Sequence, residues 1–71
     1  MENKAERFAR IAEKRTNNIL EQIRLLGNCA NKNNYSYEEE EVKKIFSVIE
    51  RELKKTKIKF KYDKEKEKFK L

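Results

Sequence analysis

The side chains of this sequence best suited to chemistry are lysines and arginines, and two sets of residues contain the candidate binding groups. The first basic set is spaced to share one helix face and consists of Arg7, Arg10, Lys14, Asn17 and Arg24. The second basic set consists of Lys54, Lys55, Lys57, Lys59 and Lys61. Lysine and arginine neutralise nucleic-acid phosphates, and asparagine can bond to phosphates or base edges. The two sets therefore predict binding to nucleic acid. Attraction to an acidic protein surface or a nucleoprotein, and plain solvation of a helix face, are the alternatives.

The excess positive charge of the chain is concentrated in the C-terminal segment that holds the second basic set. The 71 residues include 19 Lys and Arg against 13 Asp and Glu, a net charge of +6. Residues 54–71 alone carry a net +6, whereas residues 37–53 carry −3. Phe60, Tyr62 and Phe69 lie among these C-terminal lysines, where aromatic rings could stack on unpaired bases.

The composition argues against catalysis and against a bound cofactor. The chain has no histidine and one cysteine, Cys29, so a Cys/His zinc site and a His-activated nucleophile are both excluded. A single glycine is too few for a phosphate-binding loop. No apolar run approaches the roughly 20 residues that span a bilayer. We expect a cytoplasmic binding protein without enzymatic activity, cofactor, metal, membrane association or small-molecule substrate.

Two helices are needed to position the basic sets. From residue 3 to 26, one narrow stripe holds apolar residues at helical spacing: Ala5, Phe8, Ala12, Ile19, Ile23 and Leu26. Gly27, the only glycine, follows at once and predicts a left-handed C′ residue that ends this helix.

A second helix is predicted over residues 37–60. Ser36 and Glu39 form the S-x-x-E pattern of a capping box, and the acidic block from Glu38 to Glu41 suits the positive end of the helix dipole. Its stripe consists of Val42, Ile45, Phe46, Ile49, Leu53, Thr56 and Phe60. With residues 27–35 as an asparagine-rich loop, residues 1–60 predict an all-α, antiparallel helical hairpin. Two helices alone leave Ile11, Leu20 and Val48 wet, so the hairpin is expected to dimerise into a four-helix bundle or to bury this flank on a partner.

Residues 61–71 are predicted to form a basic C-terminal extension. One interpretation continues the helix to about residue 60 and leaves a Lys-rich tail. The other is a small β-hairpin, because lysine alternates with Ile58, Phe60 and Tyr62, with Phe69 available to pair across the turn.

Residues 14–60 resemble a family of small uncharacterised proteins carried on bacterial conjugative elements, plasmids and phages. The resemblance lies in Lys14-Arg15 with Asn18, "IRLLGN" at Ile23–Asn28, "NNYSY" at Asn33–Tyr37 and "KIFSVIE" at Lys44–Glu50. The family has no established activity, so the resemblance implies only an accessory role on a mobile element. That role would be nucleic-acid binding or inhibition of a host defence complex, as by an anti-CRISPR protein. The second role would use a partner-binding tip at the hairpin end, formed by Leu25, Asn28, Tyr35 and Tyr37.

Overall fold

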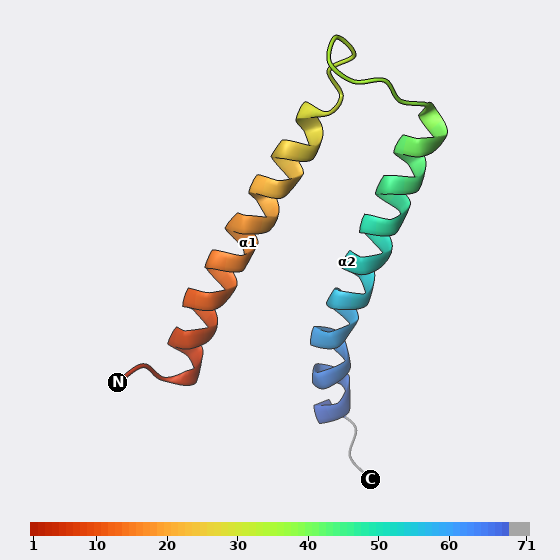
Figure 1. The fold of residues 1–71 in the computed structure, drawn as a ribbon. Coiled ribbons are helices and arrows are strands. Elements are labelled where there is room, and N and C mark those ends of the chain that lie inside the picture. Colours follow the sequence, from red (N-terminus) through yellow and green to blue (C-terminus); the bar gives the residue numbers. More distant parts are fainter. Residues whose placement is uncertain (69–71) are drawn as a thin grey trace. The chain divides into compact units, whose positions relative to one another are not determined.

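The chain folds into two long helices. The structure, a computed structural model, describes the backbone of residues 1–68 and the side chains of residues 1–61. Helix α1 spans Lys4–Asn28 and helix α2 spans Glu39–Lys68, and the described residues contain no strand (Figure 1). The helices belong to separate units, Met1–Ser36 and Tyr37–Leu71. The predicted all-α class with two helices is confirmed.

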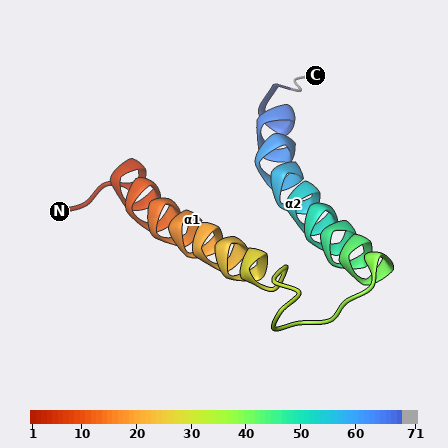
Figure 2. The same ribbon diagram turned by 90° about the horizontal axis from the view of Figure 1, so that it is seen from above.

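Helix α1 begins with an asparagine cap. Asn3 has an extended backbone, with φ −85° and ψ 176°, and its side-chain oxygen accepts a hydrogen bond of 2.8 Å from the Glu6 N–H. The Asn3 carbonyl accepts from the Arg7 N–H at 3.0 Å, which closes the first turn. Asparagine is a preferred residue at this position because its short side chain satisfies an otherwise orphan amide. The helix then runs without a break (Figure 2).

The end of α1 corrects the prediction for Gly27. This residue lies inside the helix, and no residue of the described chain, glycine included, has a positive φ. The helix closes instead with a tight turn. The Cys29 N–H donates to the Leu26 carbonyl at 3.0 Å, and the Ala30 N–H donates to the Gly27 carbonyl at 3.1 Å. These i to i+3 bonds satisfy the last carbonyls, so a left-handed residue is not required.

The start of α2 corrects the prediction for Ser36. The helix begins two residues later than predicted, and its cap lies at Glu38. The Glu38 N–H donates to the Glu41 Oε1 at 2.8 Å, and the Glu38 carbonyl accepts from the amides of Glu41 and Val42 at 3.1 and 3.3 Å. In a capping box, the glutamate three residues after the cap accepts a hydrogen bond from the backbone amide of the cap residue, and Glu41 does this for Glu38. The acidic block therefore does start the helix, but in the register of Glu38.

The end of α2 corrects the predicted C-terminal extension. The helix continues through Lys68, so residues 61–68 are neither a tail nor a strand, and residues 58–62 are helical as well. The segment has no glycine or proline, and lysine and glutamate are good helix formers, which outweighs the local alternation of lysine with apolar residues. Phe69 and Leu71, the other end of the predicted β-hairpin, lie outside the described residues.

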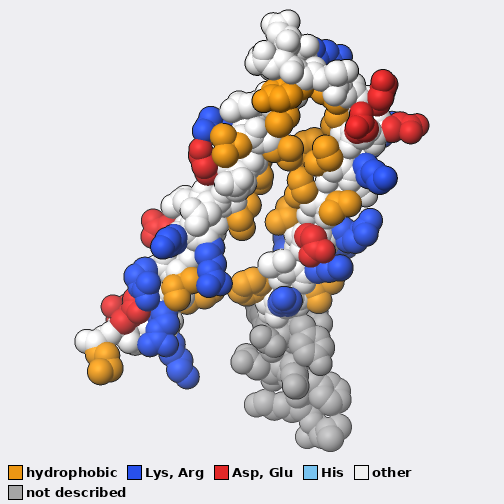
Figure 3. Space-filling model, viewed as in Figure 1, with side chains coloured by type: hydrophobic (Ala, Val, Ile, Leu, Met, Phe, Trp, Pro, Cys, Tyr) orange, Lys and Arg blue, Asp and Glu red, His pale blue; other side chains and the backbone are white. Residues whose placement is uncertain are grey.

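Neither helix buries its apolar stripe. No residue among those with described side chains is buried, and Phe8, Ile19 and Ile23 of α1 are 60%, 51% and 46% exposed. In α2, Phe46, Leu53 and Phe60 are 47%, 49% and 64% exposed. Figure 3 shows hydrophobic side chains gathered along each helix at the surface. The hairpin packing and the dimer remain predictions, and both would cover these stripes.

Candidate nucleic-acid interface

The first basic set lies entirely on α1. Arg7, Arg10, Lys14, Asn17 and Arg24 fall within Lys4–Asn28, and all five side chains are exposed. Because the helix is continuous, residues spaced by three, four and seven positions share a face. The predicted face therefore exists, but its charge is not all available.

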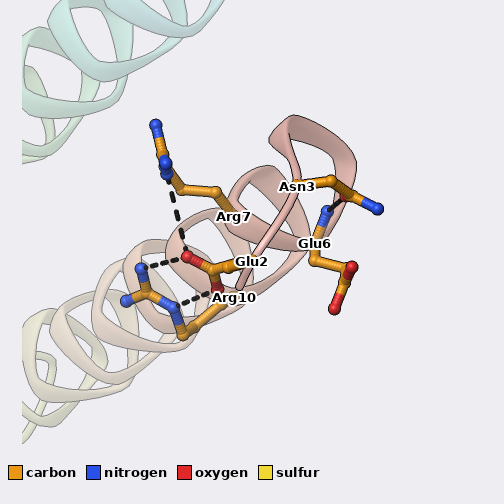
Figure 4. A network of polar contacts seen from close by, with 5 residues as sticks. All are labelled: Glu2, Asn3, Glu6, Arg7 and Arg10. Atoms are coloured by element: carbon orange, nitrogen blue, oxygen red, sulfur yellow. Dashed lines mark hydrogen bonds and ion pairs between the residues drawn. The ribbon is translucent and has the colours of Figure 1, made fainter.

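Glu2, which precedes α1, forms ion pairs with Arg7 and Arg10. Glu2 Oε2 accepts from Arg10 Nε at 2.7 Å, and Glu2 Oε1 accepts from Arg10 Nη2 at 3.0 Å. Arg7 Nε lies 3.7 Å from the same Oε1, so one carboxylate is within ion-pair distance of both guanidinium groups (Figure 4). The Arg10 hydrogen bonds are the main cause that holds the pKa of Glu2 below its usual value of 4.5; desolvation opposes this and Arg7 adds to it. The same contact raises the pKa of Arg10.

A second carboxylate neutralises Arg24. Glu21 accepts two bonds from it, from Nε at 3.0 Å and from Nη2 at 2.6 Å. These residues are three positions apart on one helix, which is the spacing of ordinary surface pairs. The contact lowers the pKa of Glu21 and raises that of Arg24. The arginines of the first basic set are thus all engaged by acids of the chain itself.

The second basic set lies in the C-terminal half of α2 and is less neutralised. Lys55 Nζ lies 3.4 Å from Glu52 Oε1. The other four lysines of the set form no ion pair within residues 1–61, and all five are exposed. On the helix, Lys54, Lys57 and Lys61 are spaced by three and four positions, so they follow one flank of the apolar stripe. This row of charge is the strongest concentration of unpaired lysine that the structure describes.

The acidic block is a structural feature of the helix start. Glu39, Glu40 and Glu41 occupy the first turn of α2. Glu39 Oε1 lies 3.7 Å from Lys43 Nζ, and Glu41 closes the cap. Across the described part of the chain, no three carboxylate or thiol groups lie close enough to hold a metal ion.

The four predicted tip residues do not form one described cluster. Leu25 and Asn28 lie in the last turn of α1 and Tyr35 in the following loop, all within the first unit, whereas Tyr37 belongs to the second. Leu25 and Tyr35 are 42% and 52% exposed. The loop is instead organised by Asn31, whose carbonyl accepts from the Tyr35 N–H at 3.0 Å and whose side chain accepts from the Asn33 N–H at 3.0 Å. An asparagine side chain that bonds to the backbone two residues ahead forms an Asx-turn.

Two residues at the start of α1, Asn3 and Glu2, were not predicted from the sequence. The Asn3 cap was signalled by the pattern Asn-x-x-Glu at residues 3–6, which matches a capping box. Glu2 had no such signal, because it precedes the helix and meets Arg10 eight positions later.

Comparison of the chain with protein-family models, with curated proteins and with solved structures finds no match. Neither helix has, within the described residues, an apolar stretch long enough to cross a bilayer.

Proposed function

We propose that this protein acts without catalysis by binding nucleic acid, alone or in a nucleoprotein, through the lysine row of α2. The observation that carries the proposal is the unpaired state of Lys54, Lys57 and Lys61 within residues 1–61, on one flank of a continuous helix. A row of exposed cations of this kind matches the repeating negative charge of a phosphate backbone. It selects for charge and not for base sequence, since phosphate contacts carry no direct sequence information.

The ring of Phe60 adds a second kind of contact. It is 64% exposed and lies between Lys59 and Lys61 in the chain. An exposed aromatic beside cations is a stacking platform for unpaired bases, at about 1–3 kcal/mol for each base stacked. The proposal therefore favours single-stranded or frayed nucleic acid over intact duplex.

The experiment is a salt titration of binding to a labelled single strand and to a duplex of the same length. Each phosphate contact contributes about 0.7 to the slope of log K against log salt on single strands and about 0.9 on duplex. Lys54→Gln/Lys57→Gln should flatten the slope by about 1.4 on single strands. Phe60→Ala should weaken binding to the single strand more than to the duplex.

A matched control lies on the same helix. Lys43→Gln/Lys44→Gln removes the same charge from the acidic half of α2, where Lys43 is already 3.7 Å from Glu39. This variant should change the slope much less. Equal slopes for both double variants, or no salt dependence at all, would exclude the lysine row as the binding surface.

Inhibition of a host defence complex by direct protein binding is the second candidate. The observation in its favour is the apolar stripe of α2, whose members Phe46 and Leu53 remain about half exposed. An amphipathic helix that lays its apolar face into a groove is a common mode of protein recognition. Such binding would survive nuclease treatment and the lysine substitutions, and would be lost in Phe46→Ser. Loss with the lysine variants but not with Phe46→Ser would exclude it.

The resemblance of residues 14–60 to proteins of conjugative elements, plasmids and phages supports a bacterial mobile element as the setting of either activity. A cytoplasmic location belongs to the same proposal, because both kinds of partner are found there.

A further inference from the structure

The contact between Glu2 and the two arginines differs from the other ion pairs described. In each of those, both residues lie on one helix, three or four positions apart. Glu2 lies before α1, and the extended backbone of Asn3 turns it back along the helix to reach Arg7 and Arg10 (Figure 4). The carboxylate can therefore leave the arginines without breaking any hydrogen bond of the helix.

The geometry of this contact is that of an oxyanion site. Arg10 presents Nε and Nη2 to two oxygens of one planar anion, at 2.7 and 3.0 Å, and Arg7 approaches one of the same oxygens. A guanidinium fork of this kind fits carboxylate and phosphate alike. The Glu2 carboxylate occupies the place that two phosphate oxygens would take.

We propose that Arg7 and Arg10 form a phosphate-binding site that Glu2 fills in the free protein, and that a nucleic-acid phosphate displaces Glu2 when the protein binds. The identity of the anion rests on the proposed function. Arg7 and Arg10 then contribute to binding only after the Glu2 carboxylate has moved, and the strength of the Glu2 contact sets how readily it moves.

The size of the effect follows from the exposure of the groups. The side chains of Arg7 and Arg10 are 59% and 63% exposed, and that of Glu2 is 31% exposed. Ion pairs at such a surface are weak and screened by salt, so the occupied form outnumbers the open form only a few-fold. Binding through a site that is open part of the time is weakened by the open fraction. Removal of the Glu2 charge should therefore tighten binding by about two- to fivefold.

The test compares Glu2→Gln with Glu13→Gln. Both variants remove one negative charge from the first unit, but Glu13 forms no ion pair within residues 1–61. Glu2→Gln should bind the duplex about two- to fivefold more tightly than Glu13→Gln. Arg7→Gln/Arg10→Gln should flatten the slope by about 1.8 on duplex.

The combination of variants separates the site from general charge. In the Arg7→Gln/Arg10→Gln background, Glu2→Gln should do no more than Glu13→Gln. If Glu2→Gln and Glu13→Gln act equally on the unaltered arginines, Glu2 does not gate this site. If these two variants act equally while Lys54→Gln/Lys57→Gln still flattens the slope, the Glu2 inference alone is overturned. An absence of nucleic-acid binding by every variant overturns the proposed function together with this inference.

Discussion

Gly27 is the position where the structure and a general rule of helix ends predict opposite effects of an alanine substitution on helix content. A glycine that follows the last apolar residue of a stripe is commonly a left-handed C′ residue. In this chain Gly27 is helical, and a Cβ built on it would meet no atom within 4 Å. Replacement by alanine therefore adds no clash and removes the conformational freedom that glycine loses on folding.

The magnitude follows from helix propensity. Alanine is favoured over glycine in a helix by about 0.5–1 kcal/mol, and the lower value applies because Gly27 is the next-to-last residue of α1. Gly27→Ala should thus raise the helix content of the chain. If Gly27 were left-handed, alanine would cost roughly 1–2 kcal/mol and helix content would fall.

The assay is far-UV circular dichroism at several temperatures, combined with the Cα chemical shift at position 27. Ala9→Gly is the matched control, since it makes the reverse change at another exposed position of the same helix and should lower helix content. A loss of helix content in Gly27→Ala, at the same protein concentration as the parent chain, would show that the tight closing turn of α1 is wrong.

Three further results are expected. Glu41→Ala should destabilise α2 by about 0.5–1 kcal/mol more than Glu40→Ala, because only Glu41 bonds to the Glu38 amide, and Ser36→Ala should have little effect; equal losses from the two glutamates would contradict this cap. The pKa of Glu2 lies below 4.5, so its ion pair persists above that pH and is lost as the pH falls through the lowered pKa; carboxyl NMR should show this midpoint rise in Arg10→Gln, because Arg10 is the main cause of the lowering, and an unchanged midpoint would refute the contact. Burial of the remaining surface of each half-exposed apolar side chain is worth about 1 kcal/mol, so the protein should self-associate at micromolar concentration, and light scattering that shows a cooperatively melting monomer would exclude this.

The helices could be predicted from the sequence more reliably than their ends. The stripe spacing gave two helices, and α1 begins one residue and ends two residues after the predicted bounds. The caps were harder, because Ser36 and Glu38 each stand three residues before a glutamate and either could start α2. The start of α2 is fixed by the hydrogen bond from the Glu38 amide to the Glu41 side chain, and that contact depends on three-dimensional geometry.

The basic face of α1 shows why counting charge along a helix overestimates what it can bind. A helical wheel places Arg7 and Arg10 together, and the structure agrees. The wheel compares only residues within the helix, so it could not show that Glu2 turns back to meet both arginines. The ion pair of Arg24 could have been predicted from the sequence, because Glu21 lies three positions before it on the same helix face.

Lys57 is the residue for which sequence and structure lead most directly to the same conclusion. A helical lysine finds ion-pair partners three or four positions away, and for Lys57 those positions hold Leu53, Lys54, Phe60 and Lys61. None is acidic, so no rotamer of Lys57 can reach a carboxylate at those spacings, and like charge at Lys54 and Lys61 raises the local potential further. Repulsion of this kind disfavours the helix by a few tenths of a kcal/mol for each pair. A bound polyanion removes that repulsion, so Lys57 should contribute more to nucleic-acid binding than Lys55, whose charge is partly met by Glu52 at 3.4 Å. Single replacements of the two lysines by glutamine, compared at low salt where screening is weak, measure this difference, and a larger loss at Lys55 would contradict the argument.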